Sequence, residues 1–430
     1  MRYASLRSAA RTSSRCMCGV IRNCGCGCIV AGAIPGQPRN RRPACFQQPV
    51  RMSKPMPDAP SRVVVMAPNW LGDIVMGLPA VADIRHRFPI ATLALAARGA
   101  LATVYESVPG VDCVVPLAAK GNIIARSRMD AEALRSREFE TAVLFPNSFY
   151  SAWVTARAGI PDRWGYRADF RGPLLTRAVR RPRGTIHRAT YYQHLVRELG
   201  SPSGPPRPHV EVHERDRTSA ARLLGGEGWV PPLTLVGLAP GAAFGFAKQW
   251  PPEHFGMLAR LLADRGIWSL LVGAASDRDA GLQVMSAFER SADARQGTGR
   301  LLNLIGRTDI RQLMGLMTYC GSLVGNDSGA TYLAAAIGLP VVAIYGPTDV
   351  RVASPLPGRD FAGTHRALSH PVFCSPCWLR ECPIDHRCMT RIQPARVFHE
   401  VVQQLFPQEA PPSRESDDRS VVAASPPLKA

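Results

Sequence analysis

The sequence predicts an α/β protein built from two doubly wound, Rossmann-like domains. Short apolar runs typical of buried strands recur along the chain, and polar turns and helical patterns separate them. They form two series of similar length on either side of a proline-rich stretch at residues 202–208 (PSGPPRP). Alternation of strands and helices favours parallel crossover connections. We therefore expect two domains that face each other across a cleft at the carboxyl edges of their sheets, where such folds bind ligands.

The positions of the elements follow from these runs. Strands are predicted at residues 62–67, 91–96, 111–116 and 141–146 in the first series, and at 233–240, 268–273, 322–325 and 341–345 in the second. The turn at residues 68–73 (PNWLGD) leads into an amphipathic helix that we expect to end near Phe88. This spacing predicts an N-terminal domain at 61–205 and a C-terminal domain at 206–407.

The two ends of the 430-residue chain lack this pattern. Residues 1–60 hold ten Arg or Lys side chains against one acid, Asp58, and six of the twelve cysteines. We expect this head to be disordered and translation to begin at or near Met52 or Met56. Residues 408–430 are rich in Pro, Ser and charge, which predicts a disordered tail.

The formal net charge of +19 indicates which classes of partner the protein can attract. It favours solubility and attraction to polyanions, and it permits nucleic-acid binding, although the chain has no zinc finger, RRM signature or basic helix. No apolar run approaches the roughly 18 residues that span a membrane. Only four of the 52 basic residues are lysines, so a lysine beside a candidate site is informative.

Three turns are candidates for binding or chemistry. Asp327 and Ser328 stand at the expected N-cap of a helix that should stop at Gly338, and such an N-terminus binds phosphate or sugar hydroxyls. A loop of small residues at 239–247 ends at Lys248, which suits a phosphate although it lacks the Walker ending. Asp73 opens the first helix and is a candidate general base. Each also has a plain structural interpretation: a well-capped helix, a surface loop, and an acid favoured by the helix dipole.

Four cysteines cluster near the end of the second series, at positions 374, 377, 382 and 388, with His386 among them. Their spacing resembles that of metal ligands but matches neither a paired zinc ribbon nor a common ferredoxin run. A structural metal, reduced thiols and a redox-dependent disulfide all remain open.

The order of the motifs resembles one known family. NWLGDIV, then PGA…AKQWP, then NDSG…AAAIGLPVVAIYGPT are similar to the family-9 glycosyltransferases, the ADP-heptose:lipopolysaccharide heptosyltransferases, over roughly residues 61–407. Residues 146–149 (PNSF) and 159–166 (GIPDRWGY) resemble the heptosyltransferase II branch. The resemblance implies a GT-B fold with the acceptor on the N-terminal domain and ADP-heptose on the C-terminal domain.

The resemblance also implies roles for particular residues. Asp73 is the expected catalytic base of an inverting transfer. The expected donor site consists of Gly241, Ala242, Ala243, Lys248, Asp327, Ser328, Gly329 and Tyr332. The expected acceptor site includes Asn69, Gly72, Asn147, Arg163 and Arg167. No cofactor is required if Lys248 and backbone amides supply the positive charge, and a structural zinc at Cys374, Cys377, Cys382 and Cys388 is the one metal considered.

The implied reaction moves heptose from ADP-L-glycero-D-manno-heptose to the heptosyl-Kdo2-lipid A inner core of lipopolysaccharide. Eight arginines between positions 163 and 188, against one acid, are either a solvated basic face or a surface for the anionic acceptor at the inner face of the cytoplasmic membrane. We accordingly expect a cytoplasmic, membrane-peripheral enzyme with no specific nucleic-acid partner.

One position departs from the family pattern. Tyr332 stands where the family has a histidine, and a tyrosine cannot carry a positive charge. The alternatives are a heptosyltransferase I-type or another ADP-sugar transferase, and a GT-B nucleotide-sugar epimerase, which would need further acid and base groups in the cleft. A nucleic-acid-binding protein is an alternative of another class, and the case for it weakens if polyanion binding disappears when residues 1–60 are removed.

Overall fold

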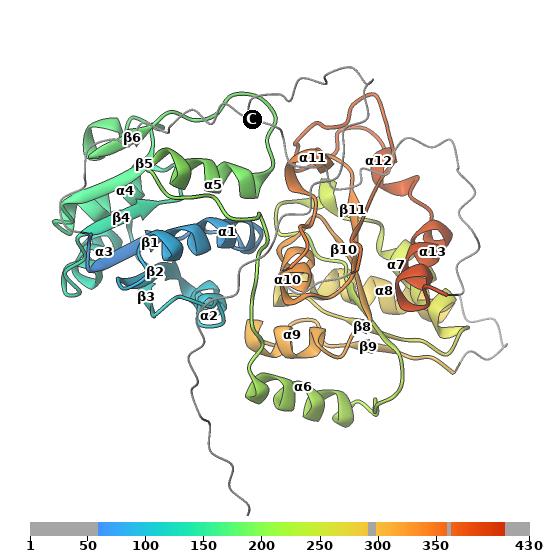
Figure 1. The fold of residues 1–430 in the computed structure, drawn as a ribbon. Coiled ribbons are helices and arrows are strands. Elements are labelled where there is room, and N and C mark those ends of the chain that lie inside the picture. Colours follow the sequence, from blue (N-terminus) through green and yellow to red (C-terminus); the bar gives the residue numbers. More distant parts are fainter. Residues whose placement is uncertain (1–58, 291–297, 359–362, 409–430) are drawn as a thin grey trace, which may run out of the picture. The chain divides into compact units, whose positions relative to one another are not determined.

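A computed structural model of the chain describes residues 59–290, 298–358 and 363–408. The predicted head at 1–60 and tail at 408–430 lie almost wholly outside this part of the chain and stay predictions. Within it, two six-stranded sheets carry helices between successive strands, which confirms the predicted α/β class (Figure 1).

The first sheet has the strand order β3-β2-β1-β4-β5-β6, and every printed pairing is parallel. Its strands are β1 (Arg62–Met66), β2 (Thr92–Arg98), β3 (Cys113–Leu117), β4 (Thr141–Leu144), β5 (Asp162–Tyr166) and β6 (Arg177–Val179). Its helices are α1 (Leu71–Arg87), α2 (Ala102–Tyr105), α3 (Ile123–Arg135), α4 (Phe149–Arg157) and α5 (Arg188–Glu198).

The second sheet has the order β12-β11-β10-β7-β8-β9 and is parallel in the same way. Its strands are β7 (Leu235–Ala239), β8 (Trp268–Leu271), β9 (Leu301–Asn303), β10 (Ser322–Asn326), β11 (Val341–Tyr345) and β12 (Arg366–Ser369). Its helices are α6 (Glu214–Gly226), α7 (Pro252–Ala263), α8 (Arg278–Arg290), α9 (Ile310–Met317), α10 (Gly329–Ile337), α11 (Val350–Ala353), α12 (Arg387–Thr390) and α13 (Pro394–Leu405).

All eight strands predicted from apolar runs are present, and the first helix ends at Arg87 as expected. Four further strands, β5, β6, β9 and β12, had no predicted counterpart. These strands are short or begin with polar residues (DRWGY, RAV, LLN and RALS), so they give no apolar run to detect. The connection from α5 to α6 spans residues 199–213 and contains both the proline-rich stretch and the boundary that we predict between 205 and 206.

Each sheet has one point at which the strand order reverses. In the first sheet it lies between β1 and β4, and in the second between β7 and β10. Chains leaving two neighbouring parallel strands there diverge to opposite sides of the sheet and leave a crevice, which is where open α/β sheets bind ligands. Three candidate segments leave these strands: Asp73 comes after β1, the 240–248 loop after β7, and the 327–329 turn after β10.

The core consists mainly of aliphatic side chains from both faces of both sheets. Val63, Val65, Leu235 and Leu323 are completely buried, as expected for strands covered on both sides. Within the described residues, no helix is both long enough and apolar enough to cross a membrane.

Candidate functional site

Asp73 lies in the first turn of α1, just after the carboxyl end of β1. Trp70 is the N-cap and makes no side-chain capping bond, so the N-cap side chain does not occupy the backbone N–H groups of the first turn. The Asp73 carboxylate is 30% exposed, and Nε of Arg188, the first residue of α5, lies 3.4 Å from its Oδ1. A carboxylate that is accessible and ion-paired can meet a substrate hydroxyl while its charge is held in place.

Burial raises the pKa of Asp73 above its ordinary value, and the nearby Asp327 adds to this effect. Arg188 and Lys248 act in the opposite direction because their positive charges favour the carboxylate. Desolvation is the largest of these effects. A raised pKa makes Asp73 a stronger base than an ordinary aspartate, which suits it to accept a proton from a hydroxyl.

Lys248 reaches across to the turn after β10. Its Nζ lies 2.5 Å from Oδ2 of Asp327, and both side chains are largely buried. The ring of Phe244 lies beneath the ammonium at 4.7 Å from its centroid. Lys248 and Asp327 are separate candidates in the sequence, and the structure brings them together.

Asn326 holds the two loops in this arrangement. This completely buried side chain donates from Nδ2 to the carbonyl of Pro240 at 2.8 Å and accepts the backbone N–H of Trp250 at 2.9 Å. It therefore clamps both ends of the 240–250 loop to the last residue of β10. A single amide with both its donor and its acceptor satisfied fixes a loop whose regular structure is one 3-10 turn, Phe246–Lys248.

The helix after β10 begins and ends as predicted. Ser328 is the N-cap of α10, and Gly338 ends it in the left-handed conformation at φ +94°. Ser328 makes no side-chain capping bond, which leaves the first backbone N–H groups of α10 without that local partner.

Tyr332, an expected donor residue, packs against Asp327 in the structure. It is buried, and its hydroxyl donates to Oδ1 of Asp327 and lies 3.3 Å from the hydroxyl of Tyr345. The hydroxyl therefore orients the Asp327 carboxylate, and a direct contact of Tyr332 with the donor stays a prediction. Burial and the neighbouring carboxylate both raise the pKa of Tyr332, so the residue stays neutral.

The N-termini of α1 and α10 lie against each other, side by side in Figure 1. A Cβ atom placed on Gly329 would lie 2.6 Å from Cβ of Leu71, and one on Gly72 would lie 3.0 Å from the ring of Tyr332. Only glycine allows these helix ends to approach so closely. The close approach of the two helix ends places Asp73 near Lys248 and Asp327.

Replacing Gly329 with alanine should therefore separate the two helix ends. The new methyl group would overlap Leu71, and overpacking of this kind costs about 1–3 kcal/mol. We expect a lower melting temperature and weaker activity. The matched control is Gly225→Ala within α6, where the added methyl meets nothing within 4 Å and alanine favours the helix. Equal melting temperatures for the two variants would contradict the packing argument.

Three of the five predicted acceptor residues lie near one another, whereas Arg163 lies in β5 and Arg167 directly follows that strand. Asn69, Gly72 and Asn147 lie after the carboxyl ends of β1 and β4, and Nδ2 of Asn147 donates to the hydroxyl of Tyr191 at 2.8 Å. Arg163 instead lies near the amino end of β5, where it donates to the carbonyls of Leu174, Ile160 and Pro161. These bonds give Arg163 a structural role, so its acceptor assignment is not supported by its position.

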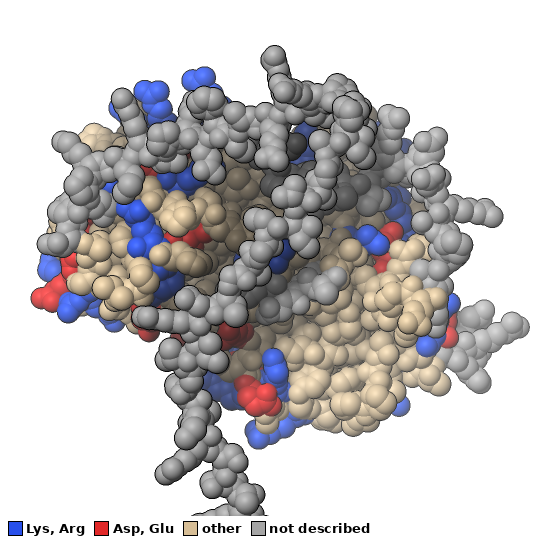
Figure 2. Space-filling model, in the orientation of Figure 1, with Lys and Arg blue, Asp and Glu red and all other residues tan. Residues whose placement is uncertain are grey.

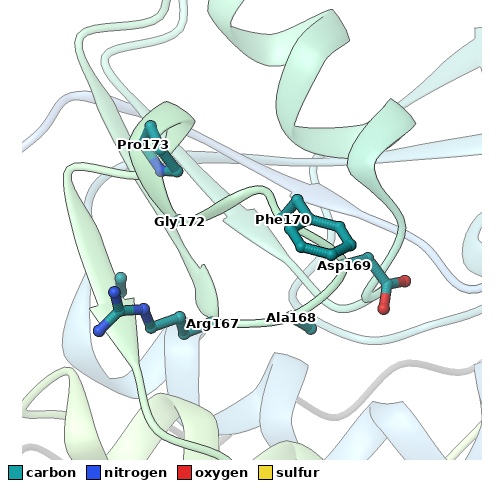
Figure 3. Close-up of a pocket in the computed structure, with 7 residues that line it drawn as sticks. Arg167, Ala168, Asp169, Phe170, Gly172 and Pro173 are labelled. Atoms are coloured by element: carbon teal, nitrogen blue, oxygen red, sulfur yellow. The ribbon is translucent and has the colours of Figure 1, made fainter.

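The arginines between 163 and 188 do not form one exposed strip. Arg171 is completely buried and donates to the carbonyl of Tyr166 at 2.9 Å and to Oγ of Ser151 at 3.1 Å. Arg167 is exposed at the rim of a hollow on the β5–β6 connection, where it and Asp169 point to opposite sides (Figure 3). This hollow is lined by residues 167–170, 172, 173 and 178, and by none of the three turns described above.

Several residues of the site had no signal in the sequence. Arg188 was considered only as one of eight arginines and Asn326 only as part of the NDSG motif, and Asp277 was not considered, although its carboxylate lies where a Cβ on Gly241 would be. A lone arginine at a helix start, or a lone aspartate in a short 3-10 turn, has no periodicity or motif that indicates its partner. These residues become recognisable only through their neighbours.

The four clustered cysteines are free thiols. Burial and, to a lesser extent, the neighbouring Cys382, Cys374 and Cys377, whose like charges would repel its thiolate, together raise the pKa of Cys388 to about 11. Across the described ranges, no group of three or more His, Cys, Asp or Glu side chains is arranged to hold a metal ion. The structural zinc remains a prediction, which the metal content of the purified protein would test.

Comparison with known proteins agrees with this geometry. The sequence profile of glycosyltransferase family 9 (heptosyltransferase) matches residues 128–386. Lipopolysaccharide heptosyltransferase 2 of Escherichia coli strain K12 is 29% identical over 366 residues, which cover 81% of this chain and 100% of that protein. Lipopolysaccharide heptosyltransferase 2 of Salmonella typhimurium strain LT2 is 30% identical over 309 residues, 69% of this chain and 85% of the relative.

A solved structure shares the fold over the same range. The structure of E. coli ADP-heptose lipopolysaccharide heptosyltransferase II matches with a TM-score of 0.67 and 28% sequence identity. The match covers 81% of this chain and 100% of that structure. The predicted fold of two facing Rossmann-like domains is confirmed by this match.

Proposed function

Because this chain belongs to glycosyltransferase family 9, and is therefore a glycosyltransferase, we propose that it transfers heptose from ADP-heptose to the heptosylated inner core of lipopolysaccharide. The relatives named lipopolysaccharide heptosyltransferase 2 support the choice of acceptor. The observation that carries the proposal is the convergence of Asp73, Lys248 and Asp327 at the points where the two sheets reverse their strand order.

In the proposed reaction, Asp73 accepts the proton of an acceptor heptose hydroxyl while that oxygen bonds to the anomeric carbon of the donor. The bond from this carbon to the diphosphate breaks, ADP leaves, and the configuration at the carbon is inverted. The transition state has oxocarbenium character, so a carboxylate close to it also stabilises its charge.

The donor would lie along the second sheet. Lys248 stabilises the negative charge that develops on the departing diphosphate, assisted by backbone amides of Gly241, Ala242 and Ala243. The free N–H groups at the start of α10, at Ser328 and Gly329, suit a phosphate or sugar oxygen. Asp327 keeps the lysine oriented through the 2.5 Å ion pair.

The function is tested by ADP release from ADP-heptose by the full chain. We expect release that depends on heptosylated Kdo2-lipid A. Release with Kdo2-lipid A that lacks heptose would instead indicate a type I enzyme. Turnover of ADP-heptose that ignores both acceptors would contradict the transferase assignment and favour an epimerase.

Peripheral binding at the inner face of the cytoplasmic membrane is part of the proposal, because the acceptor is a membrane lipid. Phe170, at the β5–β6 connection, is 98% exposed, and Arg171 beside it anchors the turn in the protein. Arg167, Arg180, Arg181 and Arg183 are exposed nearby in the sequence, and basic side chains stand out in this region of Figure 2. An exposed aromatic ring among arginines suits an anionic lipid surface.

Replacing Phe170 with serine should weaken binding to anionic lipid vesicles by about tenfold, because burial of a phenylalanine side chain contributes roughly 1.5–3 kcal/mol. Ile90→Ser is the matched control, since Ile90 is 95% exposed but follows the end of α1, away from the β5–β6 turn. Cosedimentation with vesicles measures the effect. Equal binding of the two variants would remove Phe170 from the proposed membrane surface.

A further inference from the structure

A second cavity lies beside the general base and has no assigned role. It has a volume of about 430 Å³, within the range of small-molecule sites. Residues from the start of α5 line one side of it, including Arg188 and Tyr191, and the segments after β11 line the other, including Asp349, Arg351 and Trp378. None of the residues that we expect to hold the donor lines this cavity.

We propose that this cavity binds an anionic sugar of the acceptor, next to the sugar whose hydroxyl reacts. The inference rests on the proposed function for the identity of the acceptor. The chemical class follows from the lining: two guanidinium groups for a carboxylate or phosphate, and an indole and a phenol for the apolar face and hydroxyls of a sugar ring.

Arg188 connects the cavity to the reaction. Its guanidinium lines the cavity and its Nε also lies 3.4 Å from the Asp73 carboxylate. A sugar that reaches Arg188 is therefore adjacent to the base. Tyr191 makes a second connection, because its hydroxyl accepts a hydrogen bond from Asn147, one of the predicted acceptor residues.

The opposite wall is fixed in position. Trp378 has φ +60°, a conformation that is unfavourable for a side chain of this size, and its backbone N–H donates to the carbonyl of Pro347 at 2.9 Å. The indole is 44% exposed. Arg351 pairs with Asp349 at 2.7 Å, and Asp349 also caps α11.

The hydrogen bond from His187 to the carbonyl of Ser354, with 2.9 Å between Nε2 and O, ties the two walls together.

The geometry gives the loop of clustered cysteines a function. Trp378 directly follows Cys377, so this loop presents an aromatic side chain to the cavity. Its contribution would then be the placement of the indole opposite Arg188 and Tyr191, on the acceptor side of the site.

Direct binding to the full chain tests the inference without relying on turnover. Calorimetry is done with free Kdo, a carboxylate sugar, with mannose 6-phosphate, and with neutral mannose. We expect one of the anionic sugars to bind more tightly than mannose, and its identity distinguishes the carboxylate from the phosphate. Arg351→Ala and Trp378→Ala should each weaken this binding about tenfold or more, while Trp378→Phe restores most of it.

Arg391→Ala is the matched control, because Arg391 is an exposed arginine in the same half of the chain that does not line the cavity. ADP binding should be equal in all variants. Absence of anionic-sugar binding by the wild type, or equal affinity in the wild type and both alanine variants, overturns the inference. A failure of the proposed function is separate, since it would show as absent acceptor-dependent ADP release by the wild type.

In an active enzyme the same variants should raise the KM for the acceptor and leave the KM for ADP-heptose unchanged. A raised KM for ADP-heptose alone would assign the cavity to the donor and contradict the inference. A loss of kcat with both KM values unchanged would contradict it as well.

Discussion

Replacing Asp73 with asparagine is expected to lower kcat for heptose transfer by at least about a hundredfold, the usual size of a lost general base. The amide has the same shape but cannot accept the proton from the attacking hydroxyl. Binding of ADP-heptose should change little, because the base contributes mainly in the transition state. Steady-state kinetics of ADP release, together with calorimetry of donor binding, measure the two effects separately.

Asp279→Asn is the matched control for this variant. Asp279, like Asp73, lies in the first turn of a helix, but it is exposed and outside the site. Both substitutions remove a charge that is favourable at a helix N-terminus, so a general dipole effect would appear in both. Comparable activities of the two variants would mean that Asp73 is only a helix-stabilising residue.

The pH dependence provides an independent check on Asp73. The residue must be ionised to act as a base, and burial raises its pKa above the ordinary value. The value of kcat/KM should therefore fall as the pH is lowered through this raised pKa. Replacing Arg188 with methionine removes a positive charge that lowers the pKa of Asp73, so the acidic limb should shift to higher pH. An unchanged or opposite shift would contradict the pairing.

Replacing Lys248 with methionine is expected to lower kcat by about 10²–10³, the effect typical for loss of one preorganised group that stabilises developing charge. Unlike the change at Asp73, this change should also weaken ADP binding, because the ammonium would contact the diphosphate in the ground state. The kinetics of ADP release and the affinity for ADP measure both effects.

The same substitution leaves Asp327 without its cation, so some loss of stability is expected, since removal of one partner of a buried ion pair is costly. Lys248→Arg retains the positive charge and separates an electrostatic role from a structural one. Lys120→Met is the control for removal of a lysine, because Lys120 is exposed. Full activity in Lys248→Met would exclude the lysine from leaving-group stabilisation.

Much of the candidate site was recognisable from local sequence. The turn at 326–329 and the glycine at 338 predict a helix start and stop, and the structure has both at these positions. The scarcity of lysine drew attention to Lys248, whose partner then proved to be Asp327. Such signals are local, because capping, turn formation and the apolar character of a strand depend on a few neighbouring residues.

Burial is the property of the polar residues that local sequence did not reveal. Tyr332 was expected at the donor, yet it is buried against Asp327, and Arg171 was expected in a basic strip, yet it is completely buried. Polar side chains are mostly exposed, so a polar residue in a sequence is taken to face solvent or ligand. The Tyr332 hydroxyl and the Arg171 guanidinium are exceptions, and they become visible only in the structure, which shows the groups that they bond to.

The sequence by itself determined the strands with apolar runs, the turns that follow them and the residue types placed in those turns. Only the tertiary structure decided that β7 neighbours β10, that Arg188 pairs with Asp73, and that Gly329 lies against Leu71. The physical reason is that periodicity specifies which face of an element is apolar but not which element will cover it. That choice is made by the packing of segments far apart in the chain, and the candidate site consists of such contacts.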